Sequence, residues 1–492
     1  MRNSLERTLK PRATAVSAVA VVALLVCGAS GAARPRAADE TTKTPRLDRH
    51  SFPRTLSYGK CTPSTEVARR DMVVGYAFCN TKLLRRLNPK GIFLLTPGLY
   101  PSDVNDYGGM HVTYGQGLWY WREGLGWKGG GCDTVQGPVN LGCMRPFNFD
   151  WDAMWNANGT IAQINNGTDG HYGWNLADPA GKGTRELVAK FFAYTSKVSG
   201  LYTGDWNGVF SDNWTYSALG LGWAFGPNLD TDRDGKVDNI GTLRKRWNDG
   251  LNEVGNRIRS YLPGKTVGGN GSWYPMWLGY RATDPRGWLK ASNATMVEDI
   301  SGFYTDPSAA LLLQIAKRWL TFRDPEPLPR YVLFQMDALT DSAAHLPSSV
   351  DPSKLKYMLD QGVMRSMRWG LTLALMAGAY YEIIVHQRHD TLWWYDEYDG
   401  GKGIRQRGYL GQPLGVPVRL RPEVWRRDFT RGIALNNSTS KPVTIDLKKP
   451  FRHLRGSQNP RLNNGHVVRK VTLRGHDGVI LLNAKPRTNR HR

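Results

Sequence analysis

The chain has 492 residues, of which 40% are hydrophobic and 22% charged, and its formal net charge is +23. This balance is typical of a globular protein and excludes a disordered chain, a collagen and a protein with many membrane spans. The length allows one large domain with an accessory domain, or two or three domains of average size.

Residues 1–38 have the pattern of a secretory signal peptide. Four basic residues precede an apolar run over residues 13–26, and small residues follow it up to candidate cleavage sites near Ala32 or Ala38. An alternative is lipid attachment at Cys27, which the bulky Val26 disfavours. We therefore expect a secreted or cell-wall-associated protein with no transmembrane span in the mature chain, whose net charge without the leader is +18.

Residues 39–60 are polar and charged without a hydrophobic period, which predicts a linker. Four further cysteines fall into two local pairs, Cys61 with Cys79 and Cys132 with Cys143. In an exported protein this spacing favours two disulfides, among three connectivities. A zinc site is the alternative, but no two of these cysteines are separated by only two residues, as in a zinc clip.

Short apolar runs alternate with amphipathic stretches between residues 61 and 420. The clearest helical face steps from Leu243 to Leu262 at intervals of three and four, and Asp306-Pro307 predicts the start of another helix. Buried strands that alternate with helices indicate a parallel sheet, and eight such units predict a (β/α)8 barrel with long aromatic loops. The expected strands are 91–96, 111–114, 161–165, 208–212, 266–270, 294–298, 331–335 and 372–376.

Two of these runs end on a carboxylate, Asp212 after the fourth and Glu298 after the sixth. Active sites of such barrels lie at the carboxyl ends of the strands, so both side chains are expected to face one cavity. A carboxylate pair there can hydrolyse a glycosidic bond. The alternative is that both acids are helix caps or ion-pair partners. Asp299 competes with Glu298, because alternation along a strand sends one inward and the other outward.

Amides, phenols and an aromatic-acidic segment near the strand ends are candidate sugar-binding groups. Directed hydrogen bonds from such side chains suit hydroxyl-rich ligands, although turn residues and buried amides have the same composition. Glu397 is also a reserve candidate for the acid. The predicted substrate-binding residues are Asn165, Asn213, Asn270, Gln335, Tyr380, Trp394, Asp396 and Glu397.

Asp230, Asp232, Asp234 and Asp238 have the spacing of a calcium loop, with Gly235 at the turn. The bidentate Glu of a complete EF-hand is absent, since Gly241 stands at position twelve. We expect a structural calcium or, alternatively, a solvated acidic turn. No cofactor is expected for the chemistry itself.

Residues 421–492 change pattern to short alternating strands separated by turns, without helices. This predicts a small antiparallel, β-sandwich-like domain that caps the barrel or binds carbohydrate.

Several of these segments together resemble the GHL group of glycoside hydrolases, and most closely hypothetical glycosyl hydrolase family 15. The resemblance extends over residues 90–483 and rests on GVFSDNW, the aspartate loop, MVED, WWYDEYD and the closing strands. It implies a barrel related to the α-galactosidase clan, with the nucleophile after strand four and the acid/base after strand six. Those roles fall on Asp212 and Glu298. The acid/base of that clan is commonly Asp, so Asp299 stays open as its substitute.

The sequence therefore predicts a secreted glycoside hydrolase that cleaves a polysaccharide or glycoconjugate. Retention is expected if the two carboxyls lie about 5–5.5 Å apart, whereas a gap of about 6.5–9.5 Å would indicate inversion with Asp212 as the base. The substrate is expected to be anionic, which would explain the basic charge. A non-catalytic carbohydrate-binding barrel is the alternative function. Nucleic acid is disfavoured as a partner, because the Lys and Arg residues are scattered and the chain is predicted to be exported.

Overall fold

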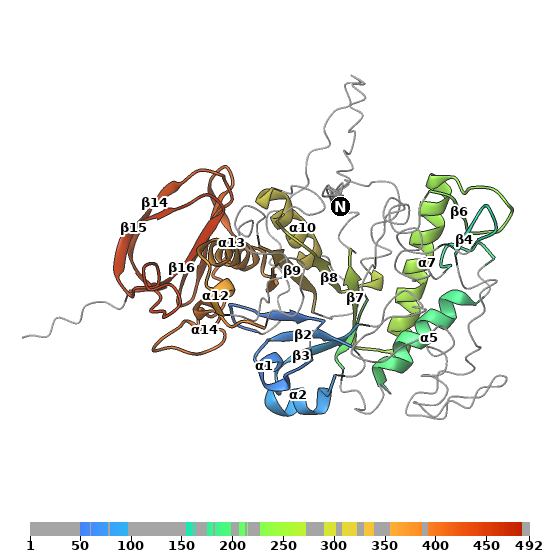
Figure 1. Cartoon of the computed structure of the whole chain (residues 1–492), viewed down its shortest axis with the longest axis horizontal. Coiled ribbons are helices and arrows are strands. Elements are labelled where there is room, and N and C mark those ends of the chain that lie inside the picture. The colour runs from blue at the N-terminus through green and yellow to red at the C-terminus, as the bar shows by residue number, and fades with distance from the viewer. Residues whose placement is uncertain are drawn as a thin grey trace, which may run out of the picture. The chain divides into compact units, whose positions relative to one another are not determined.

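The computed structural model of the chain (Figure 1) describes residues 50–59, 61–76, 79–96, 154–160, 162, 175–180, 183–197, 206–211, 214, 227–271, 290–301, 308–321, 329–338, 355–385 and 392–484. The predicted leader, the second cysteine pair, the expected strand 111–114 and nearly all of the expected strand 161–165 lie outside these residues. Within them, no helix is long and apolar enough to cross a membrane.

The larger sheet is a parallel barrel, as predicted. Its strands follow one another in chain order, and each pairs in parallel with the next. The last strand returns to the first through a parallel bridge between Thr55 and Tyr381, so that the barrel is nearly closed. The strands are β1 (Leu56–Tyr58), β2 (Met72–Gly75), β3 (Ile92–Leu95), β5 (Gly208–Ser211), β7 (Thr266–Asn270), β8 (Ala294–Val297), β9 (Tyr331–Asp337) and β10 (Tyr380–Ile384).

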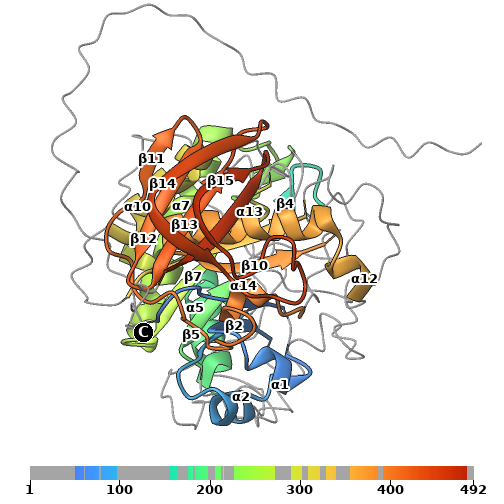
Figure 2. The same cartoon turned by 90° about the vertical axis from the view of Figure 1, so that its left-hand side faces the viewer.

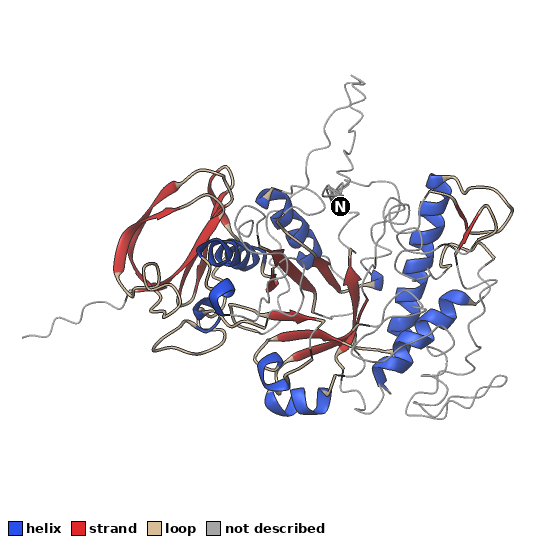
Figure 3. Cartoon of the chain, in the orientation of Figure 1, coloured by secondary structure: helices blue, strands red, loops and turns tan. Residues whose placement is uncertain are grey.

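Helices surround these strands in the outer layer (Figure 3). Helix α7 buries the predicted apolar face, which includes Leu243 and Trp247. Its amino end is capped by Asn239, whose side chain accepts from the backbone N–H groups of two first-turn residues. The helices are α1 (Ser64–Val67), α2 (Thr81–Leu87), α5 (Thr184–Lys197), α7 (Ile240–Tyr261), α10 (Ala309–Thr321), α12 (Leu355–Met358), α13 (Gln361–Ala377) and α14 (Asp396–Asp399).

The start of the barrel differs from the prediction. Strand β1 lies within the range expected to be a linker, and its three residues are buried and paired with β2. The barrel therefore begins before residue 61. Strands β1 and β2 are three and four residues long, which is too short for a clear period.

The eighth strand also differs. Residues 372–376 belong to α13, which Asp360 caps and Gly378 ends in the left-handed conformation, and the strand follows at Tyr380–Ile384. Helix α13 is apolar around almost its whole circumference, because one side packs on the barrel and the other on the C-terminal sheet. The Tyr381 hydroxyl donates to the Met367 carbonyl on the barrel side. An apolar run without periodicity resembles a buried strand, which explains the error.

The C-terminal segment forms the expected antiparallel sheet, with strand order β11-β12-β13-β16-β14-β15 (Figure 2). Arg368 of α13 makes a buried two-pronged ion pair with Asp477, at 2.9 and 3.1 Å. Gly478 follows it, where a Cβ atom would lie 2.0 Å from the Thr372 hydroxyl oxygen. The strands are β11 (Val418–Arg421), β12 (Val424–Phe429), β13 (Gly432–Asn437), β14 (Val443–His453), β15 (Val467–Leu473) and β16 (Asp477–Asn483). A two-stranded sheet, β4 (Trp155–Asn156) with β6 (Leu229–Asp230), completes the list.

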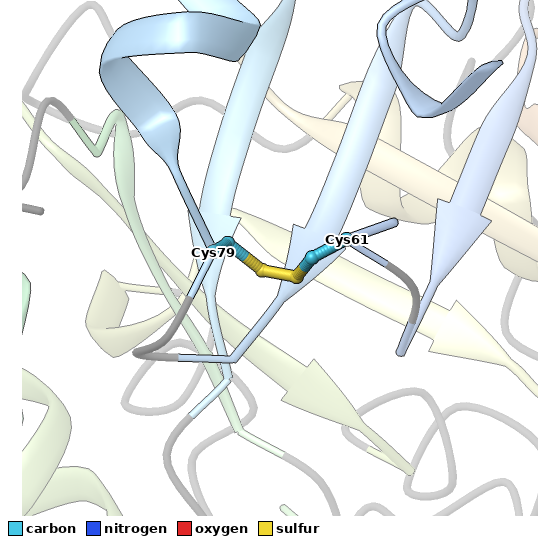
Figure 4. The surroundings of a disulfide bond; sticks show 2 residues. All are labelled: Cys61 and Cys79. Carbon is cyan, nitrogen blue, oxygen red and sulfur yellow. A yellow bond between two sulfur atoms is a disulfide. The ribbon is translucent and has the colours of Figure 1, made fainter. Parts of the chain in front are cut away.

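A disulfide joins Cys61 to Cys79, as predicted (Figure 4). It links the segments that follow β1 and β2, so it lies at the carboxyl end of the barrel. Gly75, the last residue of β2, leaves room for it, since a Cβ atom there would lie 2.5 Å from the Cys79 sulfur. The bond therefore ties together two loops on the face where a barrel carries its active site.

Candidate active site

Alternation along the strands identifies the side chains that point into the barrel. A separate apolar cluster fills its interior, while the alternate residues pack under the helices. On β8 the interior residues are Ala294 and Met296, so the next position of the same parity is Glu298. The interior cluster consists of Leu56, Tyr58, Met72, Val74, Ile92, Leu94, Phe210, Ala294, Met296, Tyr331, Leu333 and Tyr380.

Glu298 is held at the carboxyl end of the sixth barrel strand by its neighbour Asn270. The side-chain amide of Asn270, the last residue of β7, donates to Glu298 Oε2 at 2.6 Å. Asn270 is buried, whereas Glu298 is half-buried. The contact holds one carboxylate oxygen in place while the side chain keeps access to solvent.

Asp299 is used in a different way. Its backbone has a φ of 45°, a conformation uncommon for a residue with a side chain. Its carboxylate accepts from the backbone N–H of Ser301 at 3.1 Å and from the Ser301 hydroxyl. Asp299 thus stabilises the turn after β8, and among the two adjacent acids Glu298 has the interior parity.

Gln335 and Glu382 extend the row of polar interior side chains to the next two strands. The register pairs Glu382 with Gln335, and Val297 with Phe334, which brings Glu298 level with Gln335. Gln335 Nε2 lies 3.1 Å from Glu382 Oε2. The backbone N–H of Tyr58 donates to Glu382 Oε1 at 3.0 Å from across the barrel closure.

Glu382 is a buried carboxyl in this row that the sequence analysis missed. Burial raises its pKa to about 7, against the opposing effects of the Tyr58 N–H, the Gln335 amide and the charge of Arg70. The residue was missed because the eighth strand was placed eight residues too early. The signal that could have found it is an acid in the apolar run AYYEIIV, directly after the helix-ending Gly378.

Tyr380 lies in the barrel but at the opposite end. Its hydroxyl is 3.2 Å from His50 Nδ1, and the other nitrogen of His50 contacts the carbonyl of Lys90, just before β3. The guanidinium of Arg54 stacks on the Tyr380 ring at 5.4 Å from its centroid. Tyr380 therefore closes the amino end of the barrel, in contrast to its predicted role in substrate binding.

Asp396 and Glu397 lie away from the interior row, again in contrast to the prediction. The Asp396 carboxylate accepts from the backbone N–H groups of Ser457 and Gln458 at 2.8 and 2.9 Å. Glu397 is buried and accepts from the Asn463 amide at 2.9 Å, and burial raises its pKa. Both carboxylates join α14 to the loop between β14 and β15 of the C-terminal sheet.

Trp394 belongs to the same outer region. Its ring nitrogen donates to Asp399 at 2.9 Å, and the guanidinium of Arg69 stacks on the ring at 4.1 Å. Arg69 precedes the amino end of β2, so this contact lies away from the carboxyl end of the barrel. The contacts with Asp399 and Arg69 thus hold α14 in place, and the predicted role of Trp394 in sugar binding stays a prediction.

Three predicted site residues lie outside the described residues: Asn165, Asp212 and Asn213. The described part of β5 ends at Ser211. In the sequence, Asp212 stands two residues after Phe210, whose side chain belongs to the interior cluster. Strand β5 is the fourth and β8 the sixth in the barrel order, as predicted. Three strands were expected before β5, and among the described residues three precede it in the sheet, although two of them, β1 and β2, were not predicted.

The aspartate loop brings together three of its four predicted ligands. One oxygen from each of Asp230, Asp232 and Asp234 lies within 4.8 Å of the others. The Asp230 carboxylate also accepts from the N–H groups of Asp234 and Gly235, at 3.1 and 2.9 Å. Oxygen ligands of this kind suit Ca²⁺.

Asp238 is occupied differently. Its carboxylate accepts from the N–H and hydroxyl of Thr231 at 2.7 and 2.6 Å, and Arg246 lies 3.2 Å from it. Arg246 also contacts Asp232 at 3.0 Å. The loop therefore presents three clustered carboxylates, while the fourth acid braces the loop.

Comparison with solved structures finds distant resemblances among carbohydrate-active proteins. The glycoside hydrolase domain of PelA from Pseudomonas aeruginosa is 11% identical, with 69% of this chain and 96% of that chain covered and a TM-score of 0.33. Amy13B from Eubacterium rectale is 8% identical, with 90% and 98% covered and a TM-score of 0.39. α-Galactosidase I from Mortierella vinacea is 7% identical, with 87% and 96% covered and a TM-score of 0.33.

Comparison with curated protein sequences gave no match. A family model, in contrast, matches residues 148–433, which is 286 of the 492 residues. The matched range contains strands four to eight of the barrel, including Asn270, Glu298, Gln335 and Glu382. The chain belongs to hypothetical glycosyl hydrolase family 15.

Proposed function

We propose that the chain is a glycoside hydrolase in which Glu298 is the general acid/base and Asp212 the nucleophile. One observation carries the proposal: an interior glutamate, held by Asn270, lies at the carboxyl end of the sixth strand of a nearly closed parallel barrel. Half-buried and held by Asn270, Glu298 can protonate a leaving glycosidic oxygen.

Asp212 is assigned from its place in the sequence, directly after β5. Two strand spacings of about 4.8 Å separate β5 from β8 across β7. A carboxyl separation of about 5–5.5 Å is typical of retaining hydrolysis, and one of about 6.5–9.5 Å is typical of inversion. In line with the resemblance to the α-galactosidase clan, we propose a covalent glycosyl intermediate on Asp212 and retention of anomeric configuration.

The charge of the C-terminal domain supports an anionic polysaccharide or glycoconjugate as substrate. Residues 418–484 contain 14 Lys and Arg against 4 Asp and Glu, a net +10. Twelve of the 14 basic side chains are exposed; Arg426 and Arg427 are not. Attraction of this kind weakens with salt, so hydrolysis of an acidic glycan should be more salt-sensitive than hydrolysis of a neutral one.

A panel of neutral and acidic polysaccharides tests the proposal. Asp212→Asn and Glu298→Gln should each reduce turnover by about 100-fold or more. Asp299→Asn is the matched control and should keep activity, because its carboxylate serves the turn with Ser301. NMR of the first product reports its anomeric configuration. Glycan binding without products would favour a carbohydrate-binding barrel, and full activity of Asp212→Asn would refute the assignment.

We also propose export and a structural calcium. The leader pattern and the Cys61–Cys79 bond support secretion, since disulfides persist in oxidising compartments. Sequencing of the amino terminus of protein from the medium tests it, with cleavage expected near Ala32 or Ala38. The three clustered carboxylates support a Ca²⁺ that rigidifies the loop before α7.

A further inference from the structure

Glu382 has no role in the two-carboxylate mechanism, yet it is a fully buried acid in the same row as Glu298. Its two oxygens are both held, one by the Tyr58 N–H and one by the Gln335 amide. A buried carboxyl with two fixed contacts constrains the groups that hold it. The NH₂ group of the Gln335 side chain contacts Glu382. Gln335 also lies level with Glu298, which follows the neighbouring strand β8.

The orientation of an amide depends on what its partner can do. An ionised carboxyl can only accept hydrogen bonds, so an ionised Glu382 attracts the NH₂ group of the Gln335 side chain. The carbonyl group of Gln335 then faces the side on which Glu298 lies. A carboxyl that carries a proton can donate to the carbonyl end, which turns the NH₂ toward that side. The state of Glu382 thus decides whether the neighbour of Glu298 presents an acceptor or a donor.

We propose that Glu382 is a positioning residue that orients the Gln335 amide beside Glu298 and thereby sets the protonation state of the acid/base. This inference rests on the proposed function. Once Glu382 has ionised, an acceptor next to Glu298 favours its protonated form, and so does a negative charge on Glu382 two strands away. Both effects act above the pKa of Glu382, which is about 7, and there they keep Glu298 supplied with the proton that a general acid must give.

Other charged and titratable groups near Glu382 act on it from its own strand and from neighbouring elements. Arg70 favours the ionised form from the segment before β2. Tyr381 on β10 and Tyr398 on α14 interact with it electrostatically and stay neutral, since burial raises the pKa of both phenols well above the ordinary value. Because burial raises the pKa of Glu382 to about 7, both of its states are populated near neutral pH.

Two variants separate the steps of this arrangement. Glu382→Gln keeps the shape and the Tyr58 contact, but its NH₂ must donate to Gln335, which locks the orientation of the protonated state. Gln335→Met keeps the volume and removes the amide. Glu397→Gln is the matched control, because it makes the same change in a buried carboxyl that contacts Asn463 and lies outside the interior row.

Infrared spectra of protein labelled with ¹³C at glutamate carboxyls measure the effect without turnover. The signal that Glu298→Gln removes reports the titration of Glu298. Its midpoint should fall by about one pH unit in Glu382→Gln and should also fall in Gln335→Met. It should not move in Glu397→Gln. An unchanged midpoint in Glu382→Gln, or an equal shift in Glu397→Gln, would overturn the proposal.

The pH dependence of hydrolysis on the polysaccharide that the panel identifies gives the second measurement. The alkaline limb of kcat/KM should move to lower pH in Glu382→Gln, by the same amount as the infrared midpoint of Glu298. A uniform loss of kcat without a shift would indicate a merely structural role and contradict the inference. If the wild type hydrolyses nothing, the proposed activity fails, while the infrared titration still decides the coupling.

Discussion

Replacement of Glu382 by Gln should stabilise the protein at neutral and alkaline pH. The pKa of Glu382 is about 7 in the folded chain against 4.5 as its ordinary value, a difference of about 2.5 pH units. At 1.36 kcal/mol per unit this corresponds to about 3 kcal/mol. The group is fully buried, so the full difference applies.

The sign is opposite to that of most carboxylates. Between pH 4.5 and about 7 the folded chain keeps a proton on Glu382 that the unfolded chain has lost. The free energy of unfolding therefore falls as the pH rises through this window, and it levels off above the folded-state pKa. Gln cannot ionise in either state, so the variant lacks this pH-dependent loss. Its free energy of unfolding at pH 8 should therefore exceed that of the wild type by up to about 3 kcal/mol.

Urea denaturation of both proteins at a series of pH values between about 4.5 and about 8 measures this difference. The comparison removes contributions from all other titrating groups. Asp446→Asn is the control, because Asp446 is exposed and contact with Lys448 lowers its pKa, so its charge is constant over the window. A difference between wild type and Glu382→Gln that does not change with pH would refute the assignment of a raised pKa to Glu382.

Three further predictions concern stability. Removal of the disulfide by Cys61→Ser with Cys79→Ser should lower the free energy of unfolding under oxidising conditions by about 3 kcal/mol. Reduction of the wild type should lower its free energy of unfolding by the same amount. Arg368→Met should cost about 3–5 kcal/mol because it leaves Asp477 charged and buried, whereas a loss below about 1 kcal/mol would show the pair to be well hydrated. Calcium should raise the Tm of the wild type but not of Asp230→Asn, and a chelator should reverse the effect; an equal rise in both proteins would exclude the loop as the site.

The class of fold was predictable from the sequence because most of its strands and helices have simple signals. Strand β7 has the predicted bounds, residues 266–270, and the residues predicted for the apolar face of α7 are buried. The C-terminal strands followed from alternation between turns. What failed were elements whose environment is set by distant parts of the chain, such as α13, which is apolar on both sides because two sheets cover it.

The candidate site was predictable only in part, for the same reason. Glu298, Asn270 and Gln335 lie at or near the carboxyl ends of strands that were identified, and the structure brings them to one end of the barrel. Trp394, Asp396 and Glu397 have a suitable composition, but their partners are Arg69 and the C-terminal loops, which no local pattern reveals. Composition near a strand end does not specify which side of the barrel wall a side chain faces.

The choice between Glu298 and Asp299 shows what further signal the sequence contains. The four residues of β8 are all buried, so hydrophobicity alone leaves its phase undetermined. Size resolves it, because a barrel interior that admits bulky side chains from some strands needs small ones from others. Tyr331 and Tyr380 fill the interior, and Ala294 faces it beside Gly268, where a Cβ atom would lie 2.2 Å from the Ala294 carbonyl oxygen. The small residue that begins the strand therefore marks its inward phase, and that phase continues through Met296 to Glu298.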